Sequence, residues 1–149
     1  MDHNTLPYYI DNDMCTSLEN AALRGIDVRI ITPHVPDKKI ILEMTRSFYP
    51  RLMSAGVKIY EYTPGFIHAK TYIADDKIAM VGTINMDYRS LVHHFECGVW
   101  TCGTECIKDI RDDIDSTLRV CDPITEEDNR VSLPRRFLRA VGRVFATLM

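Results

Sequence analysis

The residue types best suited to chemistry are concentrated between Gly65 and Glu96. Within this stretch His68 and Lys70 are separated by one residue, in a segment whose composition predicts a β-strand. Alternate side chains of a strand lie on one face, so we expect these two side chains to point the same way. An imidazole beside an ammonium group binds an anion and can also attack it or transfer a proton. The pair therefore predicts a site for an anionic substrate.

A second group of polar residues follows in the chain. Gly82 permits a close backbone approach or an unusual backbone dihedral. Thr83 and Asn85 carry neutral hydrogen-bond donors that suit phosphate oxygens. Glu96 falls on the next predicted strand, where its carboxylate can accept a hydrogen bond from the His68 ring and fix the tautomer. Taken singly, each residue has an ordinary structural explanation, but the ordered set predicts a catalytic site for a phosphate group.

The spacing of these residues carries a resemblance to a known family. The series His68-x-Lys70-x4-Asp75-x6-Gly82-x2-Asn85 is similar, without a gap, to the HxKxxxxDxxxxxxGxxN signature of the phospholipase D superfamily. The flanking segments resemble bacterial cardiolipin synthases, so the similarity covers nearly the whole chain: residues 6–14, residues 21–31, and residues 85–91 followed by Phe95-Glu96.

The resemblance implies a role for each residue of the motif. His68 corresponds to the motif histidine, a nucleophile or acid–base partner, and Lys70 and Asn85 correspond to the phosphate-binding pair. Thr83 stands where the family often has serine, and Glu96 where it has a carboxylate near the histidine. Asp75 completes the signature. Seven residues of strand place it about 20 Å from His68, so we expect it to support the hairpin rather than contact the ring.

The chemistry implied by the resemblance is a two-step displacement at phosphorus. One histidine attacks the phosphodiester to form a phosphohistidine, and a partner histidine protonates the leaving alcohol. For a cardiolipin synthase, phosphatidylglycerol is both donor and acceptor, and glycerol is released. This chemistry needs neither cofactor nor metal. His93, His94 and Glu96 are not expected to form a metal site, because adjacent strand residues point to opposite faces.

The chain departs from the family in carrying a single motif, with no second His-x-Lys. Family members build one active site from two motif-bearing halves, and they have N-terminal membrane segments that this sequence lacks. We therefore expect a fragment, a truncated product, or a single-motif protein that completes its site as a homodimer or with a second motif-bearing half. Two alternatives remain open: a homodimeric phosphodiesterase or nuclease, and an inactive lipid-binding remnant.

Composition narrows these alternatives. The chain has 149 residues, enough for one domain, and a formal net charge of −3, which disfavours nucleic acid as the substrate. The five cysteines are scattered and odd in number, as in a protein of a reducing compartment. No stretch approaches the roughly 20 apolar residues of a membrane span. We therefore expect a peripheral protein at the cytoplasmic face of the cell membrane.

Hydrophobic periodicity predicts the elements that must position the motif. Two helix–strand units come first, and two short strands form a hairpin around Asp75 before a further strand and helix. The predicted fold class is α/β, a phospholipase D-like half with a central mixed, largely parallel sheet flanked by helices. The predicted helices are 11–25, with Asp11 as its N-cap, 37–56, with Asp37 as its N-cap, and 107–118. The predicted strands are 26–32, 57–62, 68–74, 78–81 and 95–100.

The predicted organisation has two parts. Residues 1–121 form the catalytic half-domain with its single HxKxxxxD motif, and residues 122–149 form a linker and a basic amphipathic helix. That helix, Pro134–Met149, combines an apolar stripe with four arginines: Arg135, Arg136, Arg139 and Arg143. Such a helix suits an anionic membrane surface, and it suits docking on the domain equally well.

Overall fold

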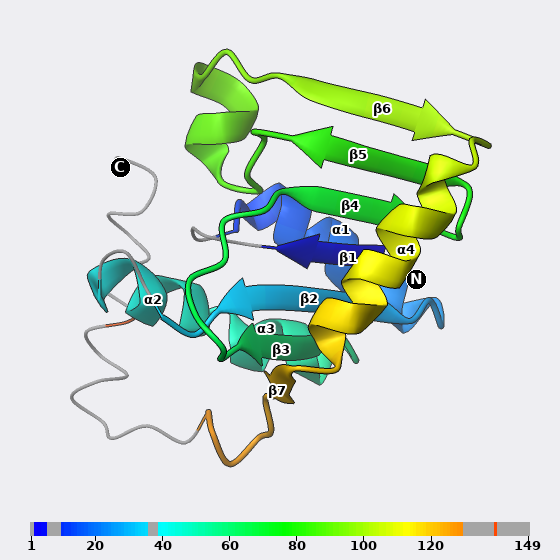
Figure 1. Cartoon of the computed structure of the whole chain (residues 1–149). Helices are drawn as coiled ribbons and strands as arrows, with labels where there is room; N and C mark the ends of the chain where they lie inside the picture. Colours follow the sequence, from blue (N-terminus) through cyan, green and yellow to red (C-terminus); the bar gives the residue numbers. More distant parts are fainter. Residues whose placement is uncertain (1, 6–9, 36–38, 130–138, 140–149) are drawn as a thin grey trace.

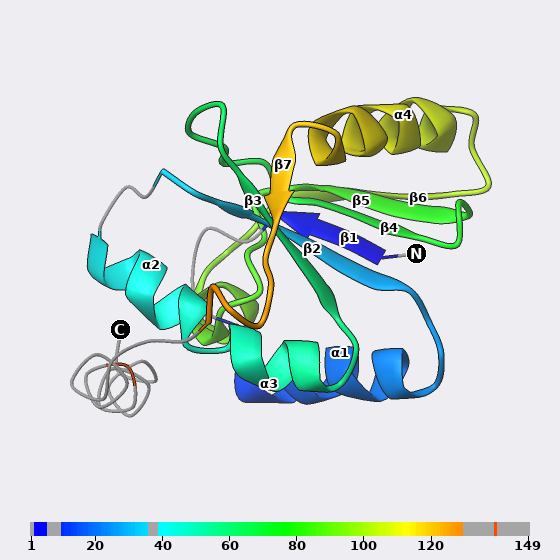
Figure 2. The ribbon, with the colours of Figure 1, turned by 90° about the horizontal axis from the view of Figure 1, so that it is seen from below.

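The strands lie side by side as one layer, with helices on both faces (Figure 1, Figure 2). The computed structural model describes residues 2–5, 10–35, 39–129 and 139. The strands are β1 (Asp2–Thr5), β2 (Val28–Pro33), β3 (Lys58–Tyr62), β4 (Thr71–Ala74), β5 (Ile78–Gly82), β6 (Gly98–Cys102) and β7 (Cys121–Pro123). The helices are α1 (Asn12–Leu23), α2 (Lys39–Arg46), α3 (Tyr49–Ser54), the π-helical turn η1 (Arg89–His93) and α4 (Cys106–Leu118).

The first sheet has the strand order β1-β2-β3-β7. Strand β2 pairs in parallel with both β1 and β3, whereas β7 pairs antiparallel with β3. All residues of β2 except Arg29 are buried, as expected for a β-branched strand that is covered on both faces. The α/β prediction of two successive helix–strand units is thereby confirmed.

The second sheet contains the motif strands in the order β4-β5-β6, and both of its pairings are antiparallel. Strand β4 lies beside β1 (Figure 1). The predicted mixed sheet flanked by helices is confirmed. The expectation that it is largely parallel is wrong, because among the described strands β2 pairs in parallel with β1 and β3 and the other three pairings are antiparallel. No helix within the described residues is long and apolar enough to cross a membrane.

The sheet separates the core into two buried clusters, each covered by helices (Figure 2). Helices α1 and α3 lie on one face of the sheet and α4 on the other (Figure 2). On the first face, Leu18 of α1 and Leu52 of α3 belong to one buried cluster with Ile59 of β3. On the second face, Ile107 and Ile114 of α4 belong to another, which also contains Ile73 of β4 and Ala79 of β5. Helix α4 therefore packs against the motif hairpin on the face of the sheet opposite α1 and α3 (Figure 2).

Two of the predicted helix boundaries follow from capping. Asp11 precedes α1, and its Oδ2 accepts hydrogen bonds from the backbone N–H groups of Asp13 and Met14 at 3.0 and 3.4 Å. This is the N-cap that was predicted, and it satisfies backbone donors that have no helical partner. Gly25 ends the turn after α1 with φ +89°, which suits glycine. The helix predicted from Ile107 to Leu118 is also present as α4.

The single helix predicted over 37–56 is wrong, because the chain forms two helices, α2 and α3, separated at Ser47 and Phe48. Pro50 explains the break. It has no N–H to donate to the carbonyl of Arg46, and its ring would clash with that carbonyl in a continuous helix. At the start of α3 the same proline is well tolerated. The predicted cap, Asp37, lies outside the described residues.

The predicted linker over residues 122–130 also needs correction at its start. Asp122 and Pro123 belong to β7, which adds an antiparallel strand to β3, with Cys121 opposite Tyr62. The pairing occupies backbone groups of β3 that would otherwise form an open sheet edge. The predicted domain boundary after residue 121 therefore falls within a strand of the sheet.

Candidate active site

Apart from Asp75, the motif residues gather at one edge of the sheet, formed by the strand ends where β4 begins, β5 ends and β6 begins. The same edge carries the carboxyl ends of the parallel strands β1, β2 and β3 (Figure 1). In open α/β sheets this edge is where ligands usually bind. Chain topology thus places the motif at an edge suited to a binding site.

His68 and Lys70 are in direct contact at this edge. The Nζ atom of Lys70 lies 2.8 Å from Nδ1 of His68 and donates to the His68 backbone oxygen, also at 2.8 Å. Lys70 is buried, His68 is exposed, and the Phe66 ring stacks on the imidazole with centroids 5.7 Å apart. The prediction that the two side chains share a side is confirmed, although β4 begins at Thr71 and both residues precede it.

The contact with Lys70 determines how the His68 ring can act. Burial lowers the pKa of the Lys70 ammonium, and the negative charges of Glu96 and Asp87 oppose that shift. While Lys70 is charged it can only donate, so Nδ1 of His68 accepts and the neutral ring carries its proton on Nε2. Nδ1 is then occupied by Lys70, and Nε2 carries a proton. The ring must lose its contact with Lys70, or pass on a proton, before it can attack phosphorus.

Glu96 has partners other than the one predicted. Its carboxylate accepts from the hydroxyls of Ser90 and Thr83, both at 2.5 Å, and lies 3.6 Å from Nδ1 of His94. The hydroxyl bonds lower the pKa of Glu96. The expected hydrogen bond from the His68 ring is not among these contacts, so that role of Glu96 stays a prediction. Glu96 lies in the connection before β6 rather than on the predicted strand.

Ser90 is a site residue that the sequence reasoning missed. It is buried, and its Oγ accepts from the backbone N–H of Asn85 at 2.9 Å while donating to Glu96. Its own N–H donates to Oδ1 of Asp87 at 2.7 Å. Burial raises the pKa of Asp87, and this N–H opposes the shift. Ser90 thus ties the turn at Asn85 to the carboxylate of Glu96, through contacts that spacing does not reveal.

Gly82 has the steric role that its residue type indicated. A Cβ atom at this position would lie 2.3 Å from the carbonyl oxygen of Cys97 and 2.5 Å from Cα of Gly98. The next residue, Thr83, donates its backbone N–H to the same Cys97 oxygen at 2.8 Å. The motif glycine therefore lets β5 and β6 approach closely enough to place the Thr83 hydroxyl against Glu96.

Asn85 offers an unused polar group. Its Oδ1 atom is buried and makes no hydrogen bond within the described part of the chain. Buried polar atoms are nearly always paired. Rotation of the amide by half a turn would place the Nδ2 donor at the same point. One of the residues predicted to bind phosphate therefore retains hydrogen-bonding capacity in its side chain.

Asp75 lies at the far end of the hairpin from His68. Asp75 and Asp76 have φ values of +50° and +55°, and the N–H of Lys77 donates to the Ala74 oxygen at 3.0 Å. These are features of a two-residue turn of the type that matches strand twist. Asp76 forms an ion pair with Arg111 of α4. The predicted hairpin around Asp75 is confirmed, and its position agrees with a supporting role.

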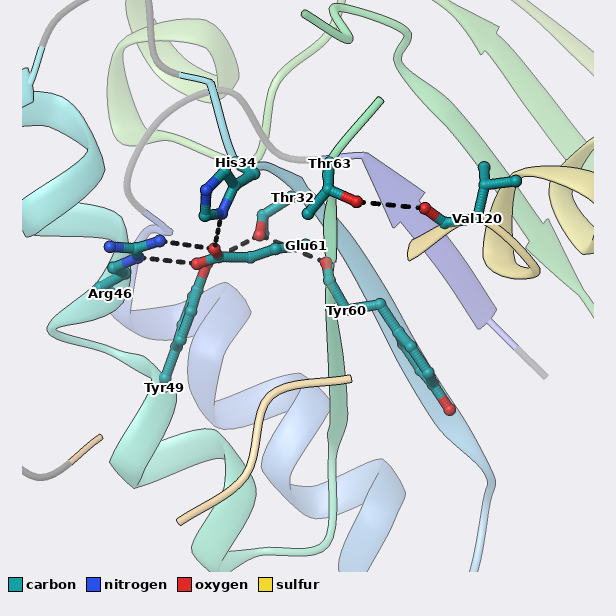
Figure 3. Close-up of polar contacts among 8 residues, drawn as sticks. All are labelled: Thr32, His34, Arg46, Tyr49, Tyr60, Glu61, Thr63 and Val120. Carbon is teal, nitrogen blue, oxygen red and sulfur yellow. Dashed lines mark hydrogen bonds and ion pairs between the residues drawn. The ribbon is translucent and has the colours of Figure 1, made fainter. Parts of the chain in front are cut away.

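A second polar cluster at the same edge surrounds Glu61, whose side chain is 2% exposed (Figure 3). The carboxylate accepts from Nε and Nη2 of Arg46 at 2.7 and 2.5 Å, and from the Tyr49 hydroxyl at 3.2 Å. Nδ1 of His34 lies 2.8 Å from Glu61 Oε2. The sequence reasoning missed this cluster. The signal in the sequence was that Glu61 occupies an inward-facing position of its strand, because it continues the alternation of the buried residues Val57 and Ile59.

Two further predictions fall partly outside the described residues. No group of three His, Cys, Asp or Glu among the described residues is arranged to hold a metal ion. The predicted C-terminal helix lies outside the described residues except for Arg139. Arg139 is buried, and its Nε donates to Glu43 of α2 at 3.0 Å. This arginine therefore docks on the domain rather than facing a membrane.

A mixed sheet with an HxK pair, a close-packed glycine and an amide at one edge defines a phospholipase D-type half-site. Comparison with known proteins agrees: residues 3–118 match the model of the cardiolipin synthase, PLD-like domain family. The chain belongs to this family.

Relatives of this chain are considerably longer than it is. An uncharacterized protein of Streptococcus mutans serotype c is 52% identical over 145 residues, which cover 96% of this chain and 32% of the relative. A cardiolipin synthase of a Geobacillus species is 41% identical over 96% of this chain and 29% of its own length. The chain thus spans about a third of the length of these relatives.

Solved structures show the same fold at low sequence identity. Nuc from Salmonella typhimurium, a phospholipase D family member, has a TM-score of 0.70 and 14% identity, with 83% of this chain and 80% of that chain covered. The phosphatidylserine synthase of Haemophilus influenzae has a TM-score of 0.71 and 12% identity, with 99% and 39% covered. These likenesses support the fold assignment.

Proposed function

We propose that this chain is one half of a phosphatidyltransferase of the cardiolipin synthase type, which joins two phosphatidylglycerols through a phosphohistidine on His68 and releases glycerol. The observation that carries the proposal is the contact between Lys70 and His68 at 2.8 Å, at the edge where the Oδ1 atom of Asn85 has no partner among the described residues. Family membership and the cardiolipin synthases among the relatives support it.

In the first step a nitrogen of His68 attacks phosphorus, and the P–O bond to the glycerol headgroup breaks. The departing alcohol takes a proton from a second imidazole. In the second step a hydroxyl of another phosphatidylglycerol attacks phosphorus, the P–N bond breaks, and the hydroxyl proton passes to that imidazole. Lys70, Asn85 and Thr83 supply donors for the non-bridging phosphate oxygens. Glu96 supports the site through Ser90 and Thr83, and Asp75 supports it through the hairpin.

The second imidazole comes from a partner, either a second copy of this chain or a second motif-bearing half. His68 cannot fill both roles, because it is bonded to phosphorus while the alcohol departs. Large exposed apolar side chains in and between η1 and β6 support such a partner: Phe95 is fully exposed, and Val92 and Trp100 are largely exposed. Large exposed apolar surface is typical of proteins that bind another protein there.

The substrate is a membrane lipid, so the protein works at the cytoplasmic face of the membrane as a peripheral protein. The segment Pro134–Met149 contributes membrane contact through its remaining arginines, Arg135, Arg136 and Arg143. Arg139 does not contribute, because it is paired with Glu43.

The test is transfer in vesicles that contain phosphatidylglycerol, with cardiolipin and glycerol as the measured products. Wild-type chain, alone and mixed with a motif-bearing N-terminal half, is compared with His68→Ala and with the surface control His93→Ala. We expect cardiolipin and an acid-labile phosphohistidine with wild type and His93→Ala, and neither with His68→Ala. Equal transfer by His68→Ala would refute the proposal.

A further inference from the structure

In the cluster around Glu61, the His34 imidazole is held by the buried carboxylate. Nδ1 of His34 is held at 2.8 Å by a carboxylate that is itself 2% exposed. The His34 side chain is half exposed, and its backbone N–H donates to the Tyr62 oxygen at 3.1 Å. Its Nε2 atom has no hydrogen bond within the described residues, so one ring nitrogen is fixed and the other has no partner there.

Charge balance at Glu61 does not require His34. Arg46 already binds both carboxylate oxygens in a two-pronged arrangement, and the Tyr49 hydroxyl adds a third donor. Such an arrangement satisfies a buried carboxylate well. What His34 gains from Glu61 is orientation and a fixed tautomer, which are the properties of a group that binds or activates a ligand.

His34 is close enough to the motif to share a substrate with it. It follows β2, Lys70 precedes β4, and β1 lies between these two strands (Figure 1). Two strand spacings amount to about 10 Å. A phosphodiester at Lys70 has a glycerol headgroup that extends several atoms from phosphorus. The headgroup can therefore reach toward His34 while the phosphate stays at Lys70.

We propose that His34, held by Glu61, is the hydroxyl-binding group of a headgroup subsite that selects a polyol on the phosphodiester at His68 and Lys70. The inference rests on the proposed function, and it adds the residue that distinguishes glycerol from a headgroup without hydroxyls. Nε2 forms one hydrogen bond with a free headgroup hydroxyl. One such bond strengthens binding about tenfold.

The experiment compares two water-soluble diesters of equal charge, ethyl glyceryl phosphate and diethyl phosphate, of which only the first carries hydroxyls, titrated into the whole chain by NMR and calorimetry. Wild type should prefer ethyl glyceryl phosphate by about tenfold. His34→Leu should remove the preference and leave diethyl phosphate binding unchanged, and His34→Gln should keep part of it. His93→Leu is the matched control and should behave as wild type. Melting curves verify folding, since Arg46 still pairs with Glu61 in these variants.

Lys70→Met separates the two hypotheses, because it should weaken both diesters alike. If binding depends on Lys70 but the ratio is the same in wild type and His34→Leu, the headgroup subsite is wrong and the proposed function stands. If neither diester binds, or Lys70→Met has no effect on either, the proposed function fails and the subsite fails with it.

Discussion

Two polar clusters lie at the same edge of the sheet, and they differ in how completely their groups are satisfied. Around Glu61, a buried carboxylate is held by Arg46, Tyr49 and His34. Around His68, the imidazole is exposed and the Oδ1 atom of Asn85 has no partner within the described residues. The first cluster is closed except at His34 Nε2, whereas the second remains open on the side where a substrate would bind.

This difference indicates where stability and where chemistry reside. Removing Glu61 or Arg46 from the closed cluster leaves a buried charge without its partner, which destabilises a fold strongly. Removing an exposed side chain of the open cluster leaves the core intact, so the loss falls on catalysis. The predictions below test this contrast from the largest expected effect to the smallest.

His68→Ala is expected to have the largest effect on activity and almost none on stability. Loss of the nucleophile should lower transfer by about 10⁴-fold or more. Because His68 is exposed, the free energy of unfolding should change by less than about 0.5 kcal/mol. Transfer in vesicles and urea denaturation measure the two quantities. A large fall in stability would show that the open cluster is also structural.

Glu61→Gln is expected to have the opposite pattern, with its main effect on stability rather than on activity. It leaves Arg46 without its carboxylate, and the free energy of unfolding should fall by about 3 kcal/mol. The control is Asp76→Asn, which removes an ion pair of a largely exposed carboxylate and should cost less than about 1 kcal/mol. Equal effects of the two substitutions in urea denaturation would contradict the contrast.

The same carboxylate predicts a pH dependence. Burial alone raises the pKa of Glu61, but hydrogen bonds from Arg46 and His34 outweigh it and hold the pKa below the ordinary 4.5. A lowered folded pKa contributes stability that is present above the unfolded pKa and is lost as pH falls through the folded pKa. Wild type should therefore lose stability below about pH 4.5, and Glu61→Gln should lose less over that range. Denaturation series at several pH values measure the difference.

Gly82→Ala is expected to lower the free energy of unfolding by about 2 kcal/mol, because the new methyl group overlaps the Cys97 carbonyl and the strands must move apart. The control is Gly65→Ala, where a Cβ atom meets nothing within 4 Å. The same shift should disturb the contact between Thr83 and Glu96. Equal stability of the two variants would show that β5 and β6 are not closely packed in solution.

The smallest effects are expected at the hairpin turn. Asp75→Val should lower stability by about 1 kcal/mol, since a β-branched residue is strained at φ +50°. Asp75→Asn should change stability by less than about 0.5 kcal/mol, because asparagine accepts this conformation. Denaturation curves distinguish the two variants. A loss of transfer in Asp75→Asn without a loss of stability would give Asp75 a direct catalytic role.

The sequence by itself determined the pairing of His68 with Lys70, the turn at Asp75, the Asp11 cap and most helices and strands. These features depend on residues close together in the chain. A two-residue period places side chains on one face, an aspartate caps the helix that follows it, and a tight turn needs residues that tolerate positive φ.

Only the tertiary structure decided which groups meet across the sheet. Spacing predicted that Glu96 would hold His68, but its oxygens accept from Ser90 and Thr83 because the connection before β6 folds back over the end of β5. Glu61 was visible only as one residue of an alternating strand. Its partners Arg46 and His34 come from α2 and from the segment after β2, and the parallel pairing of β2 with β3 brings them together. Such contacts depend on packing between distant segments, which local periodicity does not encode.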